Sequence, residues 1–413
     1  MTTVRLVILV VTYLLIAVPR VPFVRLSRPG AALVGAVAMV TIGGLPLRAA
    51  YAAIDLDVLV FLLGVLLITA YLESGGFFEW AARHVVQRAT SPRGLLAAVV
   101  VSSGLLSAFF VNDTVCLVLT PLLLAVVKPL RLKAMPFLLA LALAANVGSA
   151  MTPTGNPQNM LIGVSSGIAF GRFLAALALP SIGGLAIVFI VVMLVYRRDL
   201  PDAFVEQSET PATPFDGPLV ARSLIVFAGA LCGWLAGLSL PLVAIGAAAV
   251  LVVVALRDPS AAFERVEWPL LVFFAALFVV MRGARDLPLV AALTSAAGAQ
   301  LHGAPLHDAV VTSAAMTALS NLISNVPAVI LWLPVVPSTP HPAFIWLVMA
   351  MSSTFAGNLT LLGSMANLIV AERAEARGEC VSFVEYLRVG VPVTLLTLAW
   401  GIGTMVLTVR ASG

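Results

Sequence analysis

A single acidic residue, Asp113, stands well inside an apolar segment, directly after Asn112. In a membrane, a charge at the bilayer centre costs roughly 2.5–3.5 kcal/mol on insertion scales, so an acid there is a functional candidate by default. Burial disfavours the charged form of a carboxyl group, which suits it to take up and release a proton. The other interpretation is a capping aspartate that binds backbone N–H groups at the tip of a hairpin, and the two roles can coexist.

A polar segment, 146–159, interrupts the apolar stretch 136–170 and contains two prolines and two glycines. Such a segment cannot continue a helix, and in lipid its freed backbone groups must face protein or a watery cavity. A broken helix presents a positive half-helix N-terminus to anions and free carbonyl groups to cations. The segment 357–367 has the same character, with two glycines and no proline. The alternative for each segment is a kinked structural helix whose polar side chains bond between helices.

The two halves of the chain carry a repeated pattern around these residues. Three anchors of the first half have counterparts 213 residues further on: Ser107, Asn112 and Pro121 match Ser320, Asn325 and Pro334. Three later pairs are separated by 208 or 209 residues: Gly148 and Gly357, Gly155 and Gly363, Asn159 and Asn367. Chance matching is the alternative, but the shared order of Asn, Pro and Gly favours an internal repeat.

The composition of the 413-residue chain indicates a membrane protein. Apolar residues make up 61% of it and charged residues only 10%, against roughly 25% charged residues in an average soluble protein. Several apolar stretches exceed the ~18 residues that mark a membrane span. These features exclude a soluble enzyme, a nucleic-acid-binding protein and a secreted disulfide scaffold. The three cysteines, Cys116, Cys232 and Cys380, are far apart and lack CxxC spacing, so they suggest neither disulfides nor a zinc site.

A template of about 20 residues predicts ten membrane spans, near 4–19, 29–47, 56–72, 136–170, 173–196, 219–238, 240–256, 267–282, 343–371 and 389–409. Two further apolar segments, 95–127 and 308–336, each contain a polar tip and a proline and divide into halves of about 14–17 residues. We therefore predict an all-α polytopic membrane protein with about 10 transmembrane helices and two re-entrant helical hairpins.

The hydrophilic stretch 197–218 holds four prolines and predicts a linker between a first repeat, 1–196, and a second repeat, 219–413. Each repeat has five spans and one hairpin, and an odd number of spans places the second repeat upside down, the inverted plan of secondary transporters. With the loop 20–28 in the cytoplasm, seventeen of the 23 Lys and Arg residues lie inside and both termini lie outside. Loop charge does not distinguish re-entrant hairpins from pairs of full spans.

We predict one central site near the bilayer midplane, where the hairpins and broken helices of both repeats meet. Amides and hydroxyls can coordinate an oxyanion or a dehydrated cation, so their chemistry alone does not name the ligand. Asp113 is predicted to carry the coupling proton, since its counterpart Val326 cannot titrate. The predicted substrate- and ion-binding residues are Asn112, Asp113, Thr114, Thr152, Thr154, Gly155, Asn156, Asn159, Ser324, Asn325, Thr360, Gly363, Ser364 and Asn367.

Two stretches of the chain resemble the ion transporter superfamily, which contains arsenite permeases, citrate permeases, divalent-anion/sodium symporters and some sodium/proton antiporters. The stretch from Phe109 to Pro121 resembles the first hairpin of the arsenite- and citrate-permease-like branch, and the stretch 154–159 resembles the broken helix that follows it. The resemblance covers nearly the whole chain. It implies a scaffold domain and a transport domain in each protomer, a homodimer and an elevator-type movement.

The hairpin tips depart from one branch of that superfamily. Divalent-anion symporters carry Ser-Asn-Thr in each hairpin, whereas this chain has Val-Asn-Asp at 111–113 and Ser-Asn-Val at 324–326. The asparagine persists in both hairpins, and the proline that follows each of them persists as well. The Asn-Asp pair is closer to the arsenite-permease pattern than to that of sodium-coupled dicarboxylate transporters.

Together these features predict a secondary transporter in a bacterial-type inner (plasma) membrane. The expected substrate is a small anion or an oxyacid of the arsenite/oxyanion or carboxylate class, coupled to H⁺ or Na⁺, with no other cofactor and no nucleic-acid partner. A cation/proton antiporter is the alternative within the superfamily, and a channel or receptor-like membrane protein is the alternative outside it. No GxxxxGK[ST], HExxH or GxSxG motif points to ATP or to an enzyme. The four histidines, His84, His302, His307 and His341, lack ligand spacing, so no metal site is predicted.

Overall fold

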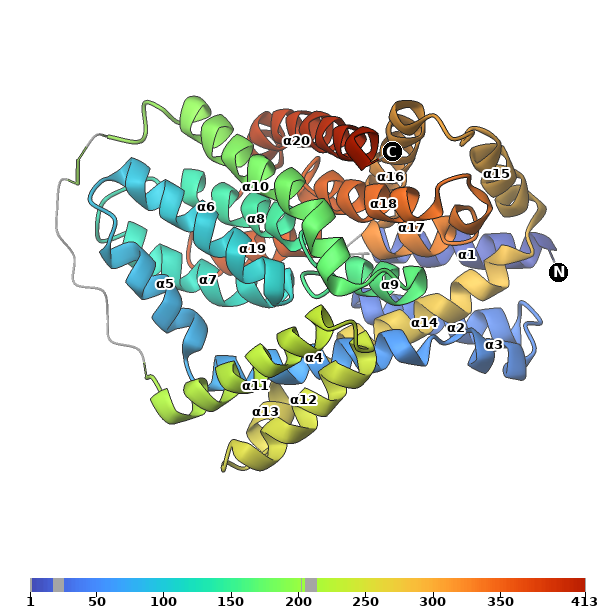
Figure 1. Ribbon diagram of the computed structural model, residues 1–413, viewed down its shortest axis with the longest axis horizontal. Coiled ribbons are helices and arrows are strands. Elements are labelled where there is room, and N and C mark those ends of the chain that lie inside the picture. The colour runs from blue at the N-terminus through green and yellow to red at the C-terminus, as the bar shows by residue number, and fades with distance from the viewer. Residues whose placement is uncertain (1, 18–25, 202, 205–213, 413) are drawn as a thin grey trace.

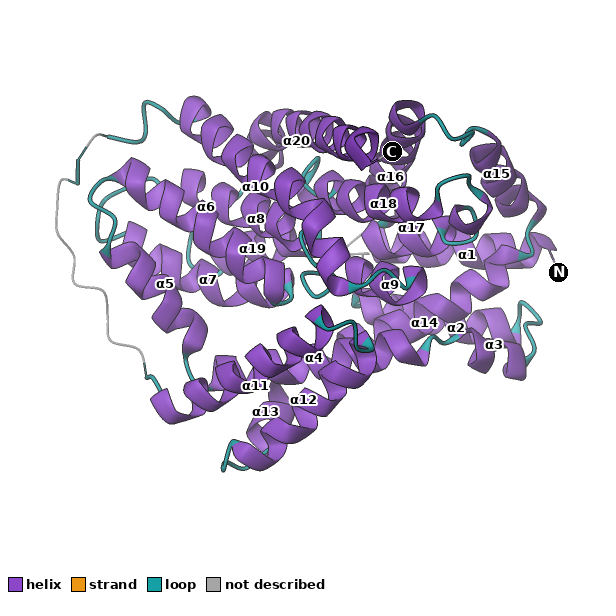
Figure 2. Ribbon diagram, viewed as in Figure 1, coloured by secondary structure: helices purple, strands orange, loops and turns teal. Residues whose placement is uncertain are grey.

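The computed structural model describes residues 2–17, 26–201, 203–204 and 214–412, and over these residues the chain contains helices and loops but no strand (Figures 1 and 2). The central part of the predicted linker 197–218 (residues 202 and 205–213) lies outside the described residues, as does most of the basic loop 20–28. The predicted fold class, an all-α polytopic membrane protein, is confirmed.

The described helices fall into two series of ten with the same order. The first series is α1 (Thr2–Ala17), α2 (Arg28–Thr41), α3 (Leu47–Ala53), α4 (Leu56–Ser74), α5 (Phe77–Gln87), α6 (Pro92–Phe109), α7 (Asn112–Val127), α8 (Met135–Ser149), α9 (Pro157–Ser166) and α10 (Phe170–Val195). The second is α11 (Gly217–Leu235), α12 (Leu240–Val254), α13 (Ser260–Arg265), α14 (Trp268–Arg285), α15 (Pro288–Ala299), α16 (Pro305–Ile323), α17 (Asn325–Trp332), α18 (Pro342–Ala356), α19 (Met365–Glu375) and α20 (Phe383–Ser412). Two 3₁₀ turns, Val336–Ser338 and Leu361–Gly363, complete the second series.

Several helices of one series pack on helices of the other series, and the equivalent helices make the reciprocal contact. Helix α2 packs on α14 as α12 packs on α4, and α8 contacts α19 as α18 contacts α9. The closing helices α10 and α20 contact each other, and each contains an internal proline, Pro180 and Pro392. Such reciprocal packing is what a two-fold axis between the repeats produces, and it agrees with the inverted arrangement expected from an odd number of spans. The residue boundaries of the repeats stay a prediction.

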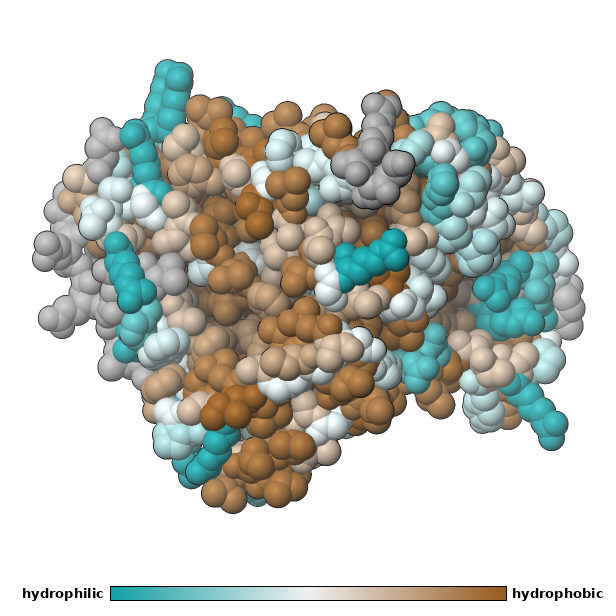
Figure 3. Space-filling view, in the orientation of Figure 1, coloured by the Kyte–Doolittle hydropathy of each residue, from teal (hydrophilic) through white to brown (hydrophobic). Residues whose placement is uncertain are grey.

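The helices form two groups, and each group draws on both repeats. One group contains the hairpins α6–α7 and α16–α17, the broken helices α8–α9 and α18–α19, and α10 and α20. The other contains α1–α4 and α11–α14, which lie mostly in the lower half of Figure 1. Figure 3 shows apolar surface over α10, α11 and α12. Exposed apolar side chains of these helices include Ile182, Ile225 and Val253, as expected of helices that face lipid.

Six of the described helices are long and apolar enough to cross a membrane: α4, α6, α10, α11, α14 and α20. The predicted hairpins are present, with tips at Phe110–Val111 and Ser324, but their halves are unequal. In the first hairpin α6 has 18 residues and α7 has 16, whereas in the second α16 has 19 and α17 has only 8. The short half of the second hairpin is followed by Pro334, which lacks a backbone N–H and so disfavours continuation of the helix.

Helices α5 and α15 were not predicted. Each is short and connects the group that contains α1–α4 and α11–α14 to the first helix of a hairpin. Helix α5 contains Glu79, Arg83 and His84, so its mean hydropathy is too low for a template that looks for membrane spans. Helix α15 is apolar but only 12 residues long, well below the length of a span.

The crossing of α4 over α12 gives a test of the packing. A Cβ at Gly64 would lie 2.5 Å from the carbonyl carbon of Ala244, so the two backbones touch. We expect Gly64→Ala to lower the free energy of unfolding by about 1–3 kcal/mol, the usual cost of overpacking. The matched control is Gly246→Ala on α12, where no described atom lies within 4 Å of the added Cβ; this change should be neutral or stabilising by up to about 1 kcal/mol. Equal thermal midpoints of the two variants in detergent would contradict the close crossing.

Candidate functional site

Asparagine is confined to one region of this protein. The chain contains eight asparagines, and all of them lie in the hairpins, in the broken helices or in the last turns that lead to them: Asn112, Asn146, Asn156, Asn159, Asn321, Asn325, Asn358 and Asn367. Seven of the eight are buried, and Asn321 is partly buried. Primary amides have two donors and an acceptor with two lone pairs, so they can satisfy both broken backbone and a ligand.

Four of these asparagines and one serine form what we call the amide cluster: Asn112, Asn146, Asn358, Ser364 and Asn367. The amide of Asn112 donates to Oδ1 of Asn146 at 2.9 Å, and Oγ of Ser364 donates to the same oxygen at 2.9 Å. In turn, Nδ2 of Asn146 donates to Oδ1 of Asn358 at 2.8 Å and to Oδ1 of Asn367 at 3.0 Å. Asn146 therefore joins the first hairpin to the second broken helix.

The first broken helix is held by a second set of bonds. Asn156 caps α9, since its Oδ1 accepts from the backbone N–H of Asn159 at 2.8 Å. The Asn156 amide donates to Oγ of Ser149 at 2.9 Å, and the hydroxyl of Thr354 donates to Oδ1 of Asn159 at 3.4 Å. Thr354 lies on α18, so this loop too is bound to the opposite repeat.

Thr152, Thr154 and Gly155, which were predicted to bind the substrate, also shape the first loop. The Thr152 hydroxyl donates to the carbonyl oxygen of Ala108, and the Thr152 and Thr154 hydroxyls are 2.9 Å apart. The carbonyl oxygen of Gly155 accepts from the backbone N–H of Asn112 at 3.0 Å. A Cβ at Gly155 would lie 2.2 Å from the carbonyl oxygen of Ser149, so only glycine allows this approach of loop and hairpin.

The second hairpin meets the second broken helix in a similar way. In the orientation that satisfies its polar atoms, the Asn325 amide donates to the carbonyl oxygens of Ser353 and Gly363, at 3.2 and 3.3 Å. Thr360 donates to Oδ1 of Asn321 at 3.0 Å. The tip residue Ser324 has φ 76°, a left-handed conformation that is uncommon for residues other than glycine.

Two buried polar atoms at the first hairpin tip have no partner among the described residues: Oγ of Ser107 and Oδ1 of Asn112. A buried acceptor or hydroxyl left without a partner costs about 1–3 kcal/mol. The amide of Asn112 is fixed by Asn146, so its oxygen is held in place and available. The Ser107 hydroxyl and the Asn112 oxygen could therefore each make a further hydrogen bond, for example to a ligand.

Asp113 and Thr114 lie apart from the amide cluster. Asp113 is 7% exposed, and its electrostatic partners are Glu267 and Arg28, both from the other helix group. The Thr114 hydroxyl donates to Oε1 of Glu267 at 3.5 Å. Among the described residues no backbone N–H donates to the Asp113 carboxylate, so a capping role finds no support. Asp113 therefore lies within electrostatic range of one carboxyl group and one guanidinium of the other helix group.

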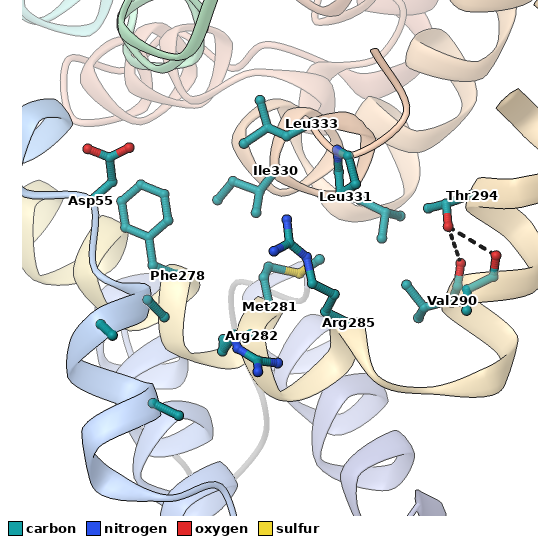
Figure 4. Close-up of a pocket in the computed structure, with 15 residues that line it drawn as sticks. Asp55, Phe278, Met281, Arg282, Arg285, Val290, Thr294, Ile330, Leu331 and Leu333 are labelled. Atoms are coloured by element: carbon teal, nitrogen blue, oxygen red, sulfur yellow. Dashed lines mark hydrogen bonds between the residues drawn. The ribbon is translucent and has the colours of Figure 1, made fainter. Parts of the chain in front are cut away.

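A separate cavity of about 620 Å³ lies between α3, α14, α15 and the C-terminal half of α17 (Figure 4). None of the predicted site residues lines it. The Arg285 side chain points across it toward Ile330 and Leu331 of the second hairpin, whereas Thr294 bonds to the backbone of Val290. The cavity borders the second hairpin but does not coincide with the amide cluster.

The structure brings most of the predicted residues together and adds four. Asn112, Asn325, Ser364 and Asn367 meet through the partners described above. The added residues are Asn146, Asn321, Thr354 and Asn358. Asn146 and Asn358 belong to the polar segments recognised in the sequence, but their side chains were not singled out. Spacing gave no signal for them, because Asn146 lies within regular helix and three of its four partners come from the other repeat.

Comparison with known proteins places the chain among transporters. Residues 11–344 match the family described as "Citrate transporter". The chain is 33% identical to the silicon efflux transporter LSI3 of Oryza sativa subsp. japonica over 95% of both chains, and 24% identical to the putative transporter arsB of Dictyostelium discoideum over 92% of this chain and 88% of that protein. The crystal structure of the Alcanivorax borkumensis YdaH transporter has the same fold, with a TM-score of 0.55 and 16% identity over 100% of this chain and 98% of that one.

The position of Asn146 leads to a test of the cluster. We expect Asn146→Ala to lower the free energy of unfolding by about 1–3 kcal/mol, because it leaves buried amides of both repeats without partners. Thr312→Val is the matched control, since the buried Thr312 hydroxyl has no described partner and the two side chains have the same shape. Thermal unfolding in detergent compares the variants, and an Asn146→Ala midpoint as high as that of Thr312→Val would show that the cluster does not hold the repeats together.

Proposed function

Because this chain belongs to the citrate transporter family, we propose that it is a secondary transporter that carries a small oxyacid or anion through the amide cluster. The supporting observation is the pair of unpartnered atoms, Oγ of Ser107 and Oδ1 of Asn112, in a buried site made by both repeats. The membership itself indicates a multi-pass membrane transporter of the citrate- and arsenite-permease type, not an enzyme. The substrate, the coupling ion and the movement are the proposed parts.

The chemistry of the cluster favours a small, hydroxyl-rich substrate. Its described side chains are amides and a hydroxyl, which carry no charge, so a neutral oxyacid needs no counter-charge there. An anion would be stabilised by the N-termini of α9 and α19, whose first turns belong to the broken helices. Relatives named for silicon efflux and as a putative arsB transporter agree with this class.

The two helix groups support an elevator-type movement. Hairpins and broken helices lie in one group, so that group would carry the bound substrate as a body. Polar contacts between the two groups include the bond from Arg28 on α2 to the Met365 sulfur on α19, at 2.7 Å, and the weak bond from Thr114 on α7 to Glu267. Such polar contacts can be exchanged during sliding more readily than an interdigitated apolar interface.

Substrate binding can be tested at the unpartnered atoms. We expect arsenite, silicic acid or citrate to raise the thermal stability of the purified protein, by about 2.7 kcal/mol at 100 times the Kd of the true substrate. Ser107→Ala should weaken that binding by about 0.5–1.5 kcal/mol, the contribution of one hydrogen bond. Ser313→Ala is the matched control, because the Ser313 hydroxyl is also buried and unpartnered among described residues but lies on α16, away from the tip of the first hairpin.

Transport in proteoliposomes distinguishes the classes of function. A carrier shows saturable flux and counter-exchange of labelled substrate. Flux that neither saturates nor exchanges would contradict the proposal and indicate a channel. Stabilisation by Na⁺ or Li⁺ without any effect of oxyacids would favour the cation/proton antiporter, for which the carboxyl pair of Asp113 and Glu267 would be the cation site.

Coupling is proposed to depend on Asp113. The neutral form crosses an apolar barrier at lower cost than the ionised form, so Asp113→Asn should leave substrate binding largely unchanged while abolishing uptake driven by a pH gradient. Asp57→Asn, at an exposed acid in the first turn of α4, is the control and should keep pH-driven uptake. If Na⁺ is the coupling ion, Asp113→Asn should instead weaken Na⁺ binding. Full pH-driven uptake by Asp113→Asn would refute the proton role.

A further inference from the structure

Three of the four histidines of this chain gather at the base of the second hairpin. The rings of His302 and His307 stack, with centroids 4.4 Å apart and planes inclined by 20°. Nε2 of His341 lies 3.9 Å from the position that a Cβ would take at Gly303. The turn before α16 and the N-cap of α18 thus bring together imidazoles that are up to 39 residues apart in the sequence.

A buried carboxylate lies beside these rings. Asp308 is 2% exposed, and its oxygens accept from the backbone N–H groups of His302 and Gly303 at 3.3 and 2.8 Å. Nδ1 of His307 is 3.3 Å from Oδ1 of the same carboxylate. The backbone bonds fix the carboxylate in place, yet each carboxylate oxygen has a second lone pair for another partner.

We propose that His302, His307 and Asp308 bind one divalent transition-metal ion, with Zn²⁺ as the best-suited ion. One ligand atom from each residue lies within 4.8 Å of the other two. Tetrahedral zinc, with bonds of about 2.0–2.2 Å, needs its ligand atoms roughly 3.4 Å apart. Both histidines are exposed, so rotation of their rings closes the difference without moving the buried carboxylate.

The donor set selects the class of ion. Two imidazole nitrogens and one carboxylate oxygen suit Zn²⁺ and its neighbours, whereas Mg²⁺ and Ca²⁺ prefer oxygen ligands alone. Water would fill the remaining positions. The stacked rings are not needed to hold the turn, because the bonds from the carboxylate to the backbone already do that. A bound ion would add a cross-link between the turn 301–304 and the first turn of α16, at the base of the hairpin and away from the amide cluster.

Zinc binding to the full-length protein tests this proposal without any transport assay. The protein is purified in detergent with its polyhistidine tag removed, and Zn²⁺ alone is added in a calorimetric titration. We expect one equivalent to bind, and His302→Ala and His307→Ala each to weaken binding at least about tenfold, since even outer-shell changes cost 10–100-fold. Zn²⁺ should raise the thermal midpoint of the wild type and have a smaller effect on these variants.

Two further variants make the result decisive. His84→Ala removes the remaining histidine, which lies on α5, and should bind Zn²⁺ as the wild type does. Asp308→Asn keeps an oxygen acceptor for one of the two backbone N–H groups but loses the charge and the second acceptor, so it should bind Zn²⁺ more weakly. Absence of a one-to-one zinc site in the wild type would overturn the proposal. Unchanged zinc binding by both His302→Ala and His307→Ala would overturn it equally.

Discussion

The structure depends on one constraint: backbone that is broken inside a membrane protein must find its hydrogen-bond partners within the protein. Two helices of this chain are interrupted in its interior, and side-chain amides supply the missing bonds. The Asn367 amide donates to the carbonyl oxygens of Gly357 and Thr360, at 2.7 and 3.2 Å. The Asn159 amide is within 3.3–3.4 Å of three carbonyl oxygens of its own loop. A buried carbonyl left without such a donor would be costly, which explains why asparagine occurs in this region and nowhere else in the chain.

The parts of the fold that are determined by neighbouring residues in the sequence could be predicted. Proline and glycine inside apolar stretches located the broken helices, and a polar tip within an apolar run located both hairpins. Asn146 was part of the recognised polar segment 146–159 but was not predicted as a site residue, since it lies in regular α8 and its spacing does not mark it. Its importance comes from Asn358 and Asn367 of the other repeat, and only the three-dimensional packing brings these residues together. Helix α5 was missed for a different reason: its charged residues give it a lower mean hydropathy than a membrane span has.

The two repeats share a fold but divide the chemistry unequally. In the second hairpin the Asn325 amide is fully engaged by two carbonyl oxygens. In the first hairpin the oxygen of Asn112 and the hydroxyl of Ser107 are buried without a described partner. The counterpart of Asp113 in the second repeat is Val326. The repeat therefore doubles the scaffold of the site, whereas the unpartnered asparagine oxygen and the acid beside it at the hairpin tip belong to the first hairpin.

Separation of Asp113 from the amide cluster bears on how coupling can work. An acid that shared the cluster would compete directly with the substrate for amide donors. Asp113 instead interacts electrostatically with Glu267 and Arg28 of the other helix group, although it is adjacent to Asn112 in the sequence. Under the proposed coupling, its charge would act between the two groups, while the same turn of α7 presents an amide to the cluster. Asn112 and Asp113 are successive residues in the first turn of α7. In the proposed mechanism, substrate and coupling ion would therefore bind to different side chains of the same helix.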